Sequence, residues 1–443
     1  MASVAAGFRS NKVAPEAPLA LDERDAPASS AAPATPPIPC AENRPTLSRR
    51  LAGATVLQIL PSLRDEPTAR AALNITAALL RSGARAIVAA EGGALVSDLQ
   101  SLGAEWLRFR SPNVNLATAP WFIRRNGRRL EDLILAEHVD IIHTYGPGAA
   151  ASARAAAMVQ PVWLITTLPD QRLEPAQLGK RQIAELVHGH RVMAHSAYVA
   201  APIVWHYHIP KDRLALVAPP IDTAAYHPLT VTGDAVAKLR AAWQIQADEL
   251  VVLAPGDISS DSGHGLLVDA ARILAGRGAH NIVFVVPGTP RSRRRDFNEI
   301  TKRAKQQGVD ELFCLGSSAD DDATLLAAAD VVVMPALAAA ADGTLAAKAQ
   351  AMGKPVIAAE IGVLPEYVLA PPRMPEDLRT GWLFRPNDPI GLARAIMDAL
   401  SLDEQEAHAL AVRAWQFAQS SFSSNGVAAD TLAVYTSLLD NGS

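Results

Sequence analysis

The chain has 443 residues, of which 49% are apolar and 19% are charged, and its net charge at pH 7 is −4. Such a composition fits two or three globular domains with large cores. The nearly balanced charge argues against a general binder of nucleic acid or of membrane surfaces. The two cysteines, Cys40 and Cys314, are too few for a disulfide framework or a metal cluster. We therefore expect a cytoplasmic protein without a metal.

The N-terminal segment, residues 1–50, is rich in Ala, Pro and Ser. It has little apolar surface to bury, so we expect a disordered tail. Charged residues interrupt its first 20 positions, which excludes the apolar region of a secretory signal. No stretch approaches about 18 strongly apolar residues. The sequence therefore predicts no membrane span, and peripheral association stays open.

From residue 54 onward, short apolar runs alternate with amphipathic segments. This rhythm predicts parallel strands joined by helical crossovers. The expected strands are 54–61, 84–90, 104–109, 139–146, 162–167 and 191–196, and the expected helices include 68–81, 94–103 and 119–137.

A Pro-rich break at residues 218–234 separates this pattern from a second one of the same kind. The strands expected in the second half are 250–256, 281–288, 311–316, 330–335 and 354–360. We expect a loop at 380–388 and a long helical stretch, with breaks, at 388–439. The sequence thus predicts a domain at 51–220, a linker at 221–235 and a second domain at 236–405, with a ligand cleft at the carboxyl ends of the strands.

The most specific strings are "DVVVMPALAAAADGTLAAKAQAMGKPVIAAEIGVLPEYV" at 330–368 and "TGWLFRPNDPIGLARAI" at 380–396. They resemble the retaining nucleotide-sugar glycosyltransferases of the GT-B fold, in particular bacterial family 4-like members. The matching positions are Asp330, Pro335, Ala351-Met352-Gly353, Pro355, Gly362, Gly381-Trp382-Leu383, Pro386 and Asp388. The resemblance implies two doubly wound Rossmann-like domains facing each other across a cleft. The first would be the acceptor side and the second the nucleotide-sugar side, with a terminal helix at 406–443 crossing back to the first domain.

The family holds the donor diphosphate with an Arg and a Lys in a pattern like P-G-R-x-x-x-x-K-G, without a metal. Here the string is "PGDISSDSGHG", which keeps Pro255 and Gly256 but places Asp257 and Ser262 at the two cationic positions. A charge-assisted hydrogen bond contributes about 1.5–3 kcal/mol, so losing two costs about 3–6 kcal/mol. The anion at position 257 adds repulsion.

The family also uses two glutamates, separated by seven residues, to bind the donor sugar and the ribose. Ala340 and Lys348 stand at these positions, and no glutamate occurs anywhere from 324 to 356. Gly343 and Thr344 remain at the start of the helix, where backbone N–H groups could still bind an anion. Together with Gly256, Gly316 and Lys348 they are the candidates for residual nucleotide or phosphate binding, although a solvated lysine is the simpler interpretation of position 348.

The first domain departs from the family in the same way. Glu66 and Pro67 lie where the family has a glycine pair, and Pro169 lies where it has a histidine. His143 follows a strand, and it fits a hydrogen-bonded structural role at least as well as a catalytic one. His195 and Ser196 match a strand end that we interpret as structural.

No catalytic residue of the family is intact. We therefore predict a degenerate glycosyltransferase with a binding or scaffolding role in bacterial polysaccharide or glycolipid assembly. It would pair with an active glycosyltransferase or with itself, and it would have no cofactor and no nucleic-acid partner. The alternative is an active enzyme that transfers a hexose from a nucleotide-diphosphate sugar through altered phosphate contacts. A third reading is a sensor of sugar nucleotides.

Overall fold

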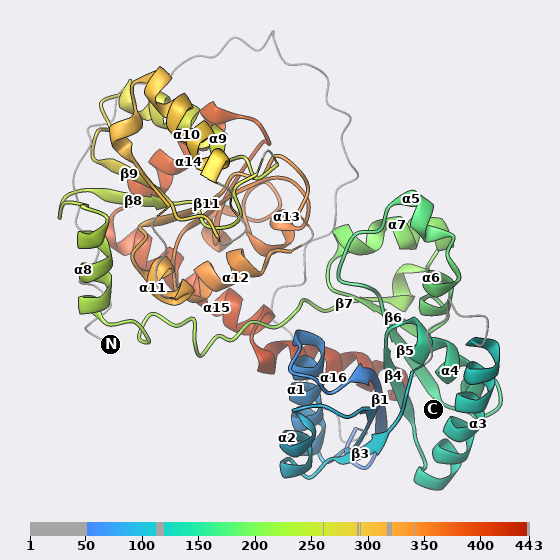
Figure 1. Cartoon of the computed structure of the whole chain (residues 1–443). Coiled ribbons are helices and arrows are strands. Elements are labelled where there is room, and N and C mark those ends of the chain that lie inside the picture. The colour runs from blue at the N-terminus through green and yellow to red at the C-terminus, as the bar shows by residue number, and fades with distance from the viewer. Residues whose placement is uncertain are drawn as a thin grey trace. The chain divides into compact units, whose positions relative to one another are not determined.

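The computed structural model describes residues 51–440, apart from 112–118, 260, 290, 291, 293, 317–320 and 341. The tail expected at residues 1–50 lies outside the described residues. The described chain forms two compact units (Figure 1). The first unit contains the residues up to Thr223 together with those from Gln419, and the second contains Ala224–Ala418.

The first unit is built on a sheet of seven parallel strands in the order β3-β2-β1-β4-β5-β6-β7. Along the chain, strands are added first on one side of β1 and then on the other, and this order confirms the doubly wound architecture. The last strand of this sheet, Leu214–Leu216, was not among those expected. The strands are β1 (Thr55–Ser62), β2 (Arg85–Glu91), β3 (Glu105–Arg108), β4 (Ile141–Tyr145), β5 (Trp163–Thr167), β6 (Arg191–Ala194) and β7 (Leu214–Leu216).

Helices join these strands as the sequence rhythm predicts. The helix expected at 119–137 is α3 (Ala119–Glu137), and that expected at 68–81 is α1 (Pro67–Arg81). The others are α2 (Val96–Ser101), α4 (Pro147–Ala157), α5 (Pro175–Leu178), α6 (Arg181–Leu186) and α7 (Ala197–Tyr207).

The end of the chain belongs to the first unit. Helix α16 (Ser424–Asp440) buries Val427, Leu432 and Tyr435 in a cluster that includes Val56 of β1 and Ile75 of α1. The preceding helix, α15 (Glu404–Ser421), lies mostly in the second unit. The segment 406–443, expected as one returning helix, is therefore divided between the two units.

The second unit has a sheet of six parallel strands in the order β10-β9-β8-β11-β12-β13. The strands are β8 (Leu250–Leu253), β9 (Ile282–Val286), β10 (Phe313–Leu315), β11 (Val331–Met334), β12 (Val356–Ala359) and β13 (Gly381–Phe384). The prediction of a loop at 380–388 was wrong, because β13 lies inside it and pairs with β12. The strand is only four residues long, begins at Gly381 and is followed closely by Pro386. Because Gly and Pro are typical of turns, the sequence pattern indicated a loop here.

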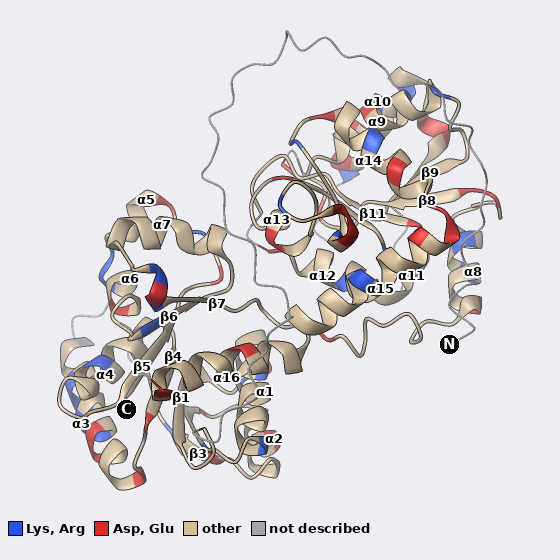
Figure 2. Ribbon diagram, turned by 180° about the vertical axis from the view of Figure 1, so that it is seen from behind, with Lys and Arg blue, Asp and Glu red and all other residues tan. Residues whose placement is uncertain are grey.

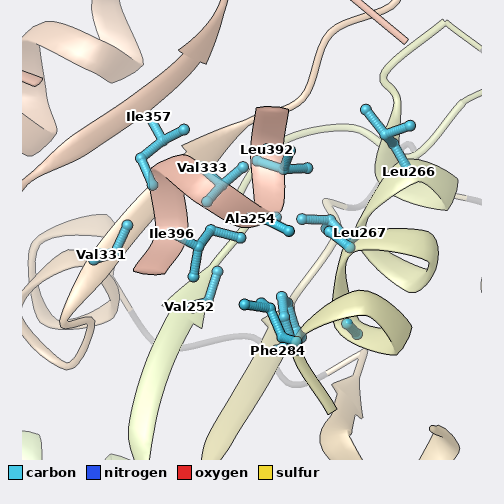
Figure 3. Close-up of a cluster of buried hydrophobic side chains, with 14 of the residues drawn as sticks. Val252, Ala254, Leu266, Leu267, Phe284, Val331, Val333, Ile357, Leu392 and Ile396 are labelled. Atoms are coloured by element: carbon cyan, nitrogen blue, oxygen red, sulfur yellow. The ribbon is translucent and has the colours of Figure 1, made fainter. Parts of the chain in front are cut away.

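A large hydrophobic cluster of the second unit covers one face of this sheet. Val252, Val331 and Ile357 of the strands pack with Leu267 of one helix and Ile396 of another (Figure 3). The helices of the unit are α8 (Gly233–Ala242), α9 (His264–Ala275), α10 (Arg294–Gln307), α11 (Asp322–Ala327), α12 (Thr344–Ala351), α13 (Leu364–Tyr367) and α14 (Pro389–Leu400).

Each unit carries an acidic residue just before the strand that pairs with its first strand. An Asp140 carboxylate oxygen accepts the N–H of Thr55 at 2.8 Å, and one of Asp330 accepts the N–H of Val251 at 2.7 Å. Arg240 pairs with the same Asp330 oxygen at 3.3 Å. Asp330, one of the residues that carry the family resemblance, therefore anchors the amino edge of the sheet, away from the strand ends where ligands bind.

Candidate functional site

The candidate site is the carboxyl edge of the second unit's sheet, where the loops after β8 and β11 meet. Gly263 has φ +74°, and a Cβ atom on it would lie 1.7 Å from the carbonyl oxygen of Pro335. The backbone N–H groups of Leu337 and Ala338 both donate to the carbonyl of Asp261, at 2.8 and 3.1 Å. The two loops are therefore fixed against each other through their backbones, and only glycine fits at 263.

Asp257 lies exposed at the start of the β8 loop, at the position of the family arginine. Thr289, in the loop after β9, donates a hydrogen bond to its carboxylate. The neighbouring residue Ile258 donates its N–H to Ser292 at 3.0 Å. The β8 and β9 loops thus hold a negative charge where the sequence resemblance leads us to expect a positive one.

Ser262, at the position of the family lysine, is used to fold its own loop. Its hydroxyl accepts the N–H of Ser259 at 2.9 Å and lies 2.7 Å from Nδ1 of His264. Burial lowers the pKa of His264 to about 4, so the ring is neutral at pH 7. Its Nε2 lies 3.3 Å from the carbonyl oxygen of Ala254 and donates there, so the single Ser262 hydroxyl proton has two acceptors within reach, Nδ1 of His264 and the carbonyl oxygen of Ser259 at 2.8 Å.

Ala340 occupies the position of the first family glutamate and offers no polar side-chain atom. Its backbone carbonyl accepts the N–H of Val363 at 3.1 Å. A Cβ atom on Gly362 would lie 2.4 Å from the same oxygen. Gly362, another of the residues that carry the resemblance, is therefore needed for the close approach of two backbones. The loop is thus held through backbone contacts, and position 340 contributes no acidic side chain.

The N-terminus of α12, expected as a residual anion site, has an acidic residue beside it. The exposed Asp342 accepts the N–H of Thr344 on a carboxylate oxygen at 2.8 Å. Gly343 is buried against the ring of Tyr367, where a Cβ atom would come within 2.4 Å of the ring. Because a carboxylate already accepts from this helix end, a phosphate there would meet a like charge.

Lys348, at the position of the second family glutamate, is already engaged. Its Nζ lies 3.3 Å from a carboxylate oxygen of Asp322 on α11 and 4.7 Å from the centre of the Tyr226 ring. Burial acts to lower the pKa of Lys348, but the contacts with Tyr226 and Asp322 outweigh it and raise the pKa above its ordinary value. The lysine stays charged, and its charge is directed at a carboxylate and a ring of its own unit.

The two remaining candidates for residual binding lie on the same edge but on different strands. Gly256 follows β8 at φ +111° with open space beside its Cα, so its backbone is accessible. Gly316 follows β10 and donates its N–H to the carbonyl of Val286 at 3.0 Å. Since β9 separates β10 from β8, Gly316 lies apart from the β8 and β11 loops, whereas Gly256 follows β8, the strand next to β11.

In the first unit, the residues in place of the family glycine pair serve as a helix start. Pro67 is the first residue of α1, where a missing N–H costs nothing, and Glu66 precedes it in an extended conformation. Asp65 and Arg70 form an ion pair on the outside of this turn. The segment is thus built to begin a helix, and its second position has no N–H to offer a ligand.

His143 lies in a buried polar network and is 1% exposed. Its Nδ1 lies 2.7 Å from the hydroxyl of Tyr435 on α16, and its Nε2 lies 2.8 Å from the hydroxyl of Thr167. Burial lowers the pKa of His143 to about 3, with a smaller effect from His195. The structural interpretation of His143 is therefore favoured, because both ring nitrogens are used and the ring is out of reach of solvent.

The neighbouring positions are also structural. Pro169 follows Leu168, whose N–H donates to the carbonyl of Met193 at 2.8 Å and extends the β5–β6 pairing. Ser196 caps α7 by accepting the N–H of Val199 at 3.0 Å. Burial lowers the pKa of His195, which contacts a backbone carbonyl through Nδ1.

Within the described residues, no cluster of His, Cys, Asp or Glu has the makings of a metal site. Over the same part of the chain, no helix is long and apolar enough to cross a membrane.

Three residues at the site were missed by the sequence reasoning. Asp342 precedes Gly343-Thr344 in a pattern typical of a helix start, so it could have been found. Asp322 and Tyr226 lie 26 and 122 residues before Lys348 and carry no local signal of that contact.

With this geometry in view, comparison with known families identifies the chain. The family described as "Glycosyltransferase Family 4" matches residues 68–225, and the family described as "Glycosyl transferases group 1" matches residues 236–414. The chain belongs to the GT-B-fold glycosyltransferases.

Curated relatives share only part of the chain. A D-inositol 3-phosphate glycosyltransferase of Streptomyces scabiei is 29% identical over 278 residues, which cover 61% of this chain and 59% of the relative. A lipopolysaccharide 1,2-N-acetylglucosaminetransferase of Salmonella typhimurium is 33% identical over 196 residues, or 43% of this chain and 49% of the relative. The chain thus spans only about half to three fifths of the length of these relatives.

Solved structures share the fold over nearly the whole described chain. A glycosyltransferase from Rickettsia africae has a TM-score of 0.65 at 22% identity and covers 88% of this chain and 99% of its own. The Anabaena protein HepE, solved in complex with UDP, has a TM-score of 0.61 at 18% identity and covers 86% of this chain and 100% of its own.

Proposed function

We propose that this glycosyltransferase-family protein is catalytically degenerate and acts by binding or scaffolding in bacterial polysaccharide or glycolipid assembly. The observation that carries the proposal is the use of the former donor positions for internal contacts. Ser262 is hydrogen-bonded within its own loop, and Lys348 is paired with Asp322. Ala340 has no polar group to offer.

The electrostatics of the edge support the same conclusion. The loop segments 254–263 and 335–343 contain no Lys or Arg, but they contain Asp257, Asp261 and Asp342. Transfer from a nucleotide sugar releases a diphosphate, and an enzyme must place positive charge or N–H donors where that charge develops. Three carboxylates on the two loops oppose the binding of such a leaving group.

The scaffold, by contrast, is kept. Gly263 and Gly362 still allow the close backbone approaches that shape the loops. Loops that keep a defined backbone shape but lack the cationic side chains for a diphosphate are suited to binding another molecule without transferring a sugar. The named activities of the relatives, on inositol phosphate and lipopolysaccharide, support a setting in glycolipid or polysaccharide assembly.

Calorimetric titration with uridine- and guanosine-diphosphate sugars tests the proposal. We expect binding in the millimolar range or weaker, and no transfer of sugar to water or to added acceptors. A nucleotide-binding relative titrated in parallel shows that the preparation of each donor is sound. Micromolar binding of any donor by the unmodified protein, or its turnover, would reject degeneracy.

One observation favours the alternative of an active transferase with altered phosphate contacts. Thr289 and Ser292 hold the β9 loop to the β8 loop. Arg291 and Arg293 belong to that β9 loop by sequence, and they lie outside the described residues. Turnover of a donor by the unmodified protein would establish this alternative, and replacing both arginines by alanine would then test whether they supply the altered phosphate contacts, because donor binding should be lost.

A further inference from the structure

A cavity in the second unit lies between α9 and α14, away from the loops of the candidate donor site. Its volume is about 430 Å³, which is in the range of cavities that hold small molecules. Three arginines line it: Arg272 of α9, Arg277 just after that helix, and Arg394 of α14. Both helices carry Lys or Arg, which are blue in Figure 2.

The spacing of the lining residues directs them away from the core. On α9 the lining positions 269, 272 and 273 are three and four residues apart, and on α14 the positions 390 and 394 are four apart, so each set lies on one side of its helix. The other sides are buried in the core of the unit through Leu267 of α9 and through Leu392 and Ile396 of α14 (Figure 3). Packing on the sheet therefore holds the two arginine-bearing helices in fixed positions.

The aspartate in the lining is already engaged from its other side. One carboxylate oxygen of Asp269 accepts from Arg303 of α10, and the other accepts from Gln307 at 2.7 Å. Burial raises the pKa of Asp398, one turn after Arg394, against the attraction of that arginine. Among the residues that the structure describes, no ion pair joins any of the three lining arginines to a carboxylate. The cavity therefore has a net positive charge.

Helix electrostatics explain only part of this cluster. Arg272 and Arg277 lie at the end of α9, where positive charge stabilises a helix C-terminus. Arg394 lies in the middle of α14, where that effect is absent. Ile390, one turn before it, is 49% exposed although it is large and apolar. Convergent guanidinium groups beside an exposed isoleucine are typical of a ligand site.

We propose that this cavity binds a small organic phosphate, with the phosphate on the arginines and the carbon skeleton on Ile273 and Ile390. A phosphate monoester presents about two negative charges and three acceptor oxygens at pH 7. The planar guanidinium of arginine matches these oxygens in pairs. A carboxylate has two oxygens and one charge, so it would leave part of the arginine cluster unmatched.

The position and size of the cavity define what it can hold. Helix α9 begins at His264, beside the donor loop, and Arg272 lies about 12 Å further along the helix axis. The two sites are therefore distinct, and the inference does not depend on whether the donor site is active. A long polyanion would extend beyond a cavity of about 430 Å³ onto a chain whose net charge is −4, which favours a small molecule.

Titration calorimetry of the full chain with phenyl phosphate, inorganic phosphate and benzoate tests the proposal. We expect phenyl phosphate to bind with a Kd of about 1 mM or tighter, and added salt should weaken this binding. Inorganic phosphate cannot contact the isoleucines, and benzoate lacks one charge and one oxygen. Each of these two should therefore bind at least about fivefold more weakly than phenyl phosphate.

Paired variants assign the binding to the cavity. Arg272→Gln with Arg394→Gln should weaken phenyl phosphate binding by about two orders of magnitude, because each charge-assisted hydrogen bond contributes about tenfold. The matched control is Lys302→Gln with Lys305→Gln, which makes the same change of net charge at exposed positions of α10 outside the cavity and should leave binding unchanged. Ile390→Ser should weaken binding of phenyl phosphate but not of inorganic phosphate.

Each possible result decides the proposal. Absence of phenyl phosphate binding, or an equal loss in the lysine control, would overturn it. So would unchanged binding in the double arginine variant with an unchanged melting temperature. Equal affinities for inorganic phosphate and phenyl phosphate, or for benzoate and phenyl phosphate, would reject an organic phosphate as the ligand. The affinity for uridine diphosphate, which measures the donor site, enters none of these outcomes.

Discussion

The double substitution Asp257→Arg with Ser262→Lys returns the two family cations to the loop after β8. Both positions lie on a loop whose backbone is fixed by Gly263, so the new side chains start from the edge where a diphosphate would approach. Each charge-assisted hydrogen bond contributes about 1.5–3 kcal/mol. Because Asp257 is exposed, we take the lower figure, and two bonds give about 3 kcal/mol, or roughly a 150-fold gain in affinity.

Two side effects of this substitution follow from the structure. Replacing Ser262 removes the acceptor for the Ser259 N–H and the hydroxyl beside His264, so the melting temperature should fall slightly. The affinity gain is electrostatic in origin and should shrink as salt is added. Asp257→Asn alone removes only the repulsion and should give a much smaller gain.

Titration calorimetry with uridine diphosphate measures the effect on nucleotide-diphosphate affinity. The matched control is Glu404→Arg with Ser401→Lys, which makes the same change of net charge between α14 and α15, far from the candidate site in the sequence and on exposed positions. A folded double variant at 257 and 262 that binds no better than this control would refute the reasoning. So would a gain that does not respond to salt.

Three further predictions test the buried network around His143 and the close backbone approach at Gly263. Tyr435→Phe should destabilise the protein by about 1 kcal/mol in thermal unfolding, because His143 loses its nearest hydrogen-bond partner; an unchanged stability would contradict the buried network. The pKa of His143 is lowered from its ordinary value of 6.5 to about 3, so between these values the unfolded chain binds a proton that the folded chain does not. The free energy of unfolding should therefore fall by about 1.4 kcal/mol per pH unit as pH drops through this window, and His143→Gln should reduce that slope. Gly263→Ala should cost more than about 2 kcal/mol, because it combines a positive φ with a clash against Pro335. The control Gly278→Ala has a similar φ of +84° and open space, and it should cost only about 1 kcal/mol.

Much of the fold could be predicted from the sequence, because alternating strands and helices leave a local periodic signal. The ends of α3 at Ala119 and Glu137 agree with the expectation. The short strand β13 was missed because a four-residue run between turn residues is too brief to show a period. The seventh strand of the first sheet is only three residues long and was missed for the same reason.

At the candidate site, the sequence by itself predicted which charges differ from the family pattern. The absence of a glutamate from 324 to 356 and the presence of Asp257 and Ser262 follow from reading the chain. Only the tertiary structure decided what the replacements do instead. Lys348 meets an aspartate and a tyrosine from two other segments, and His143 meets a tyrosine 292 residues away. Such contacts depend on how helices pack on a sheet, and packing brings together residues whose spacing in the chain follows no period.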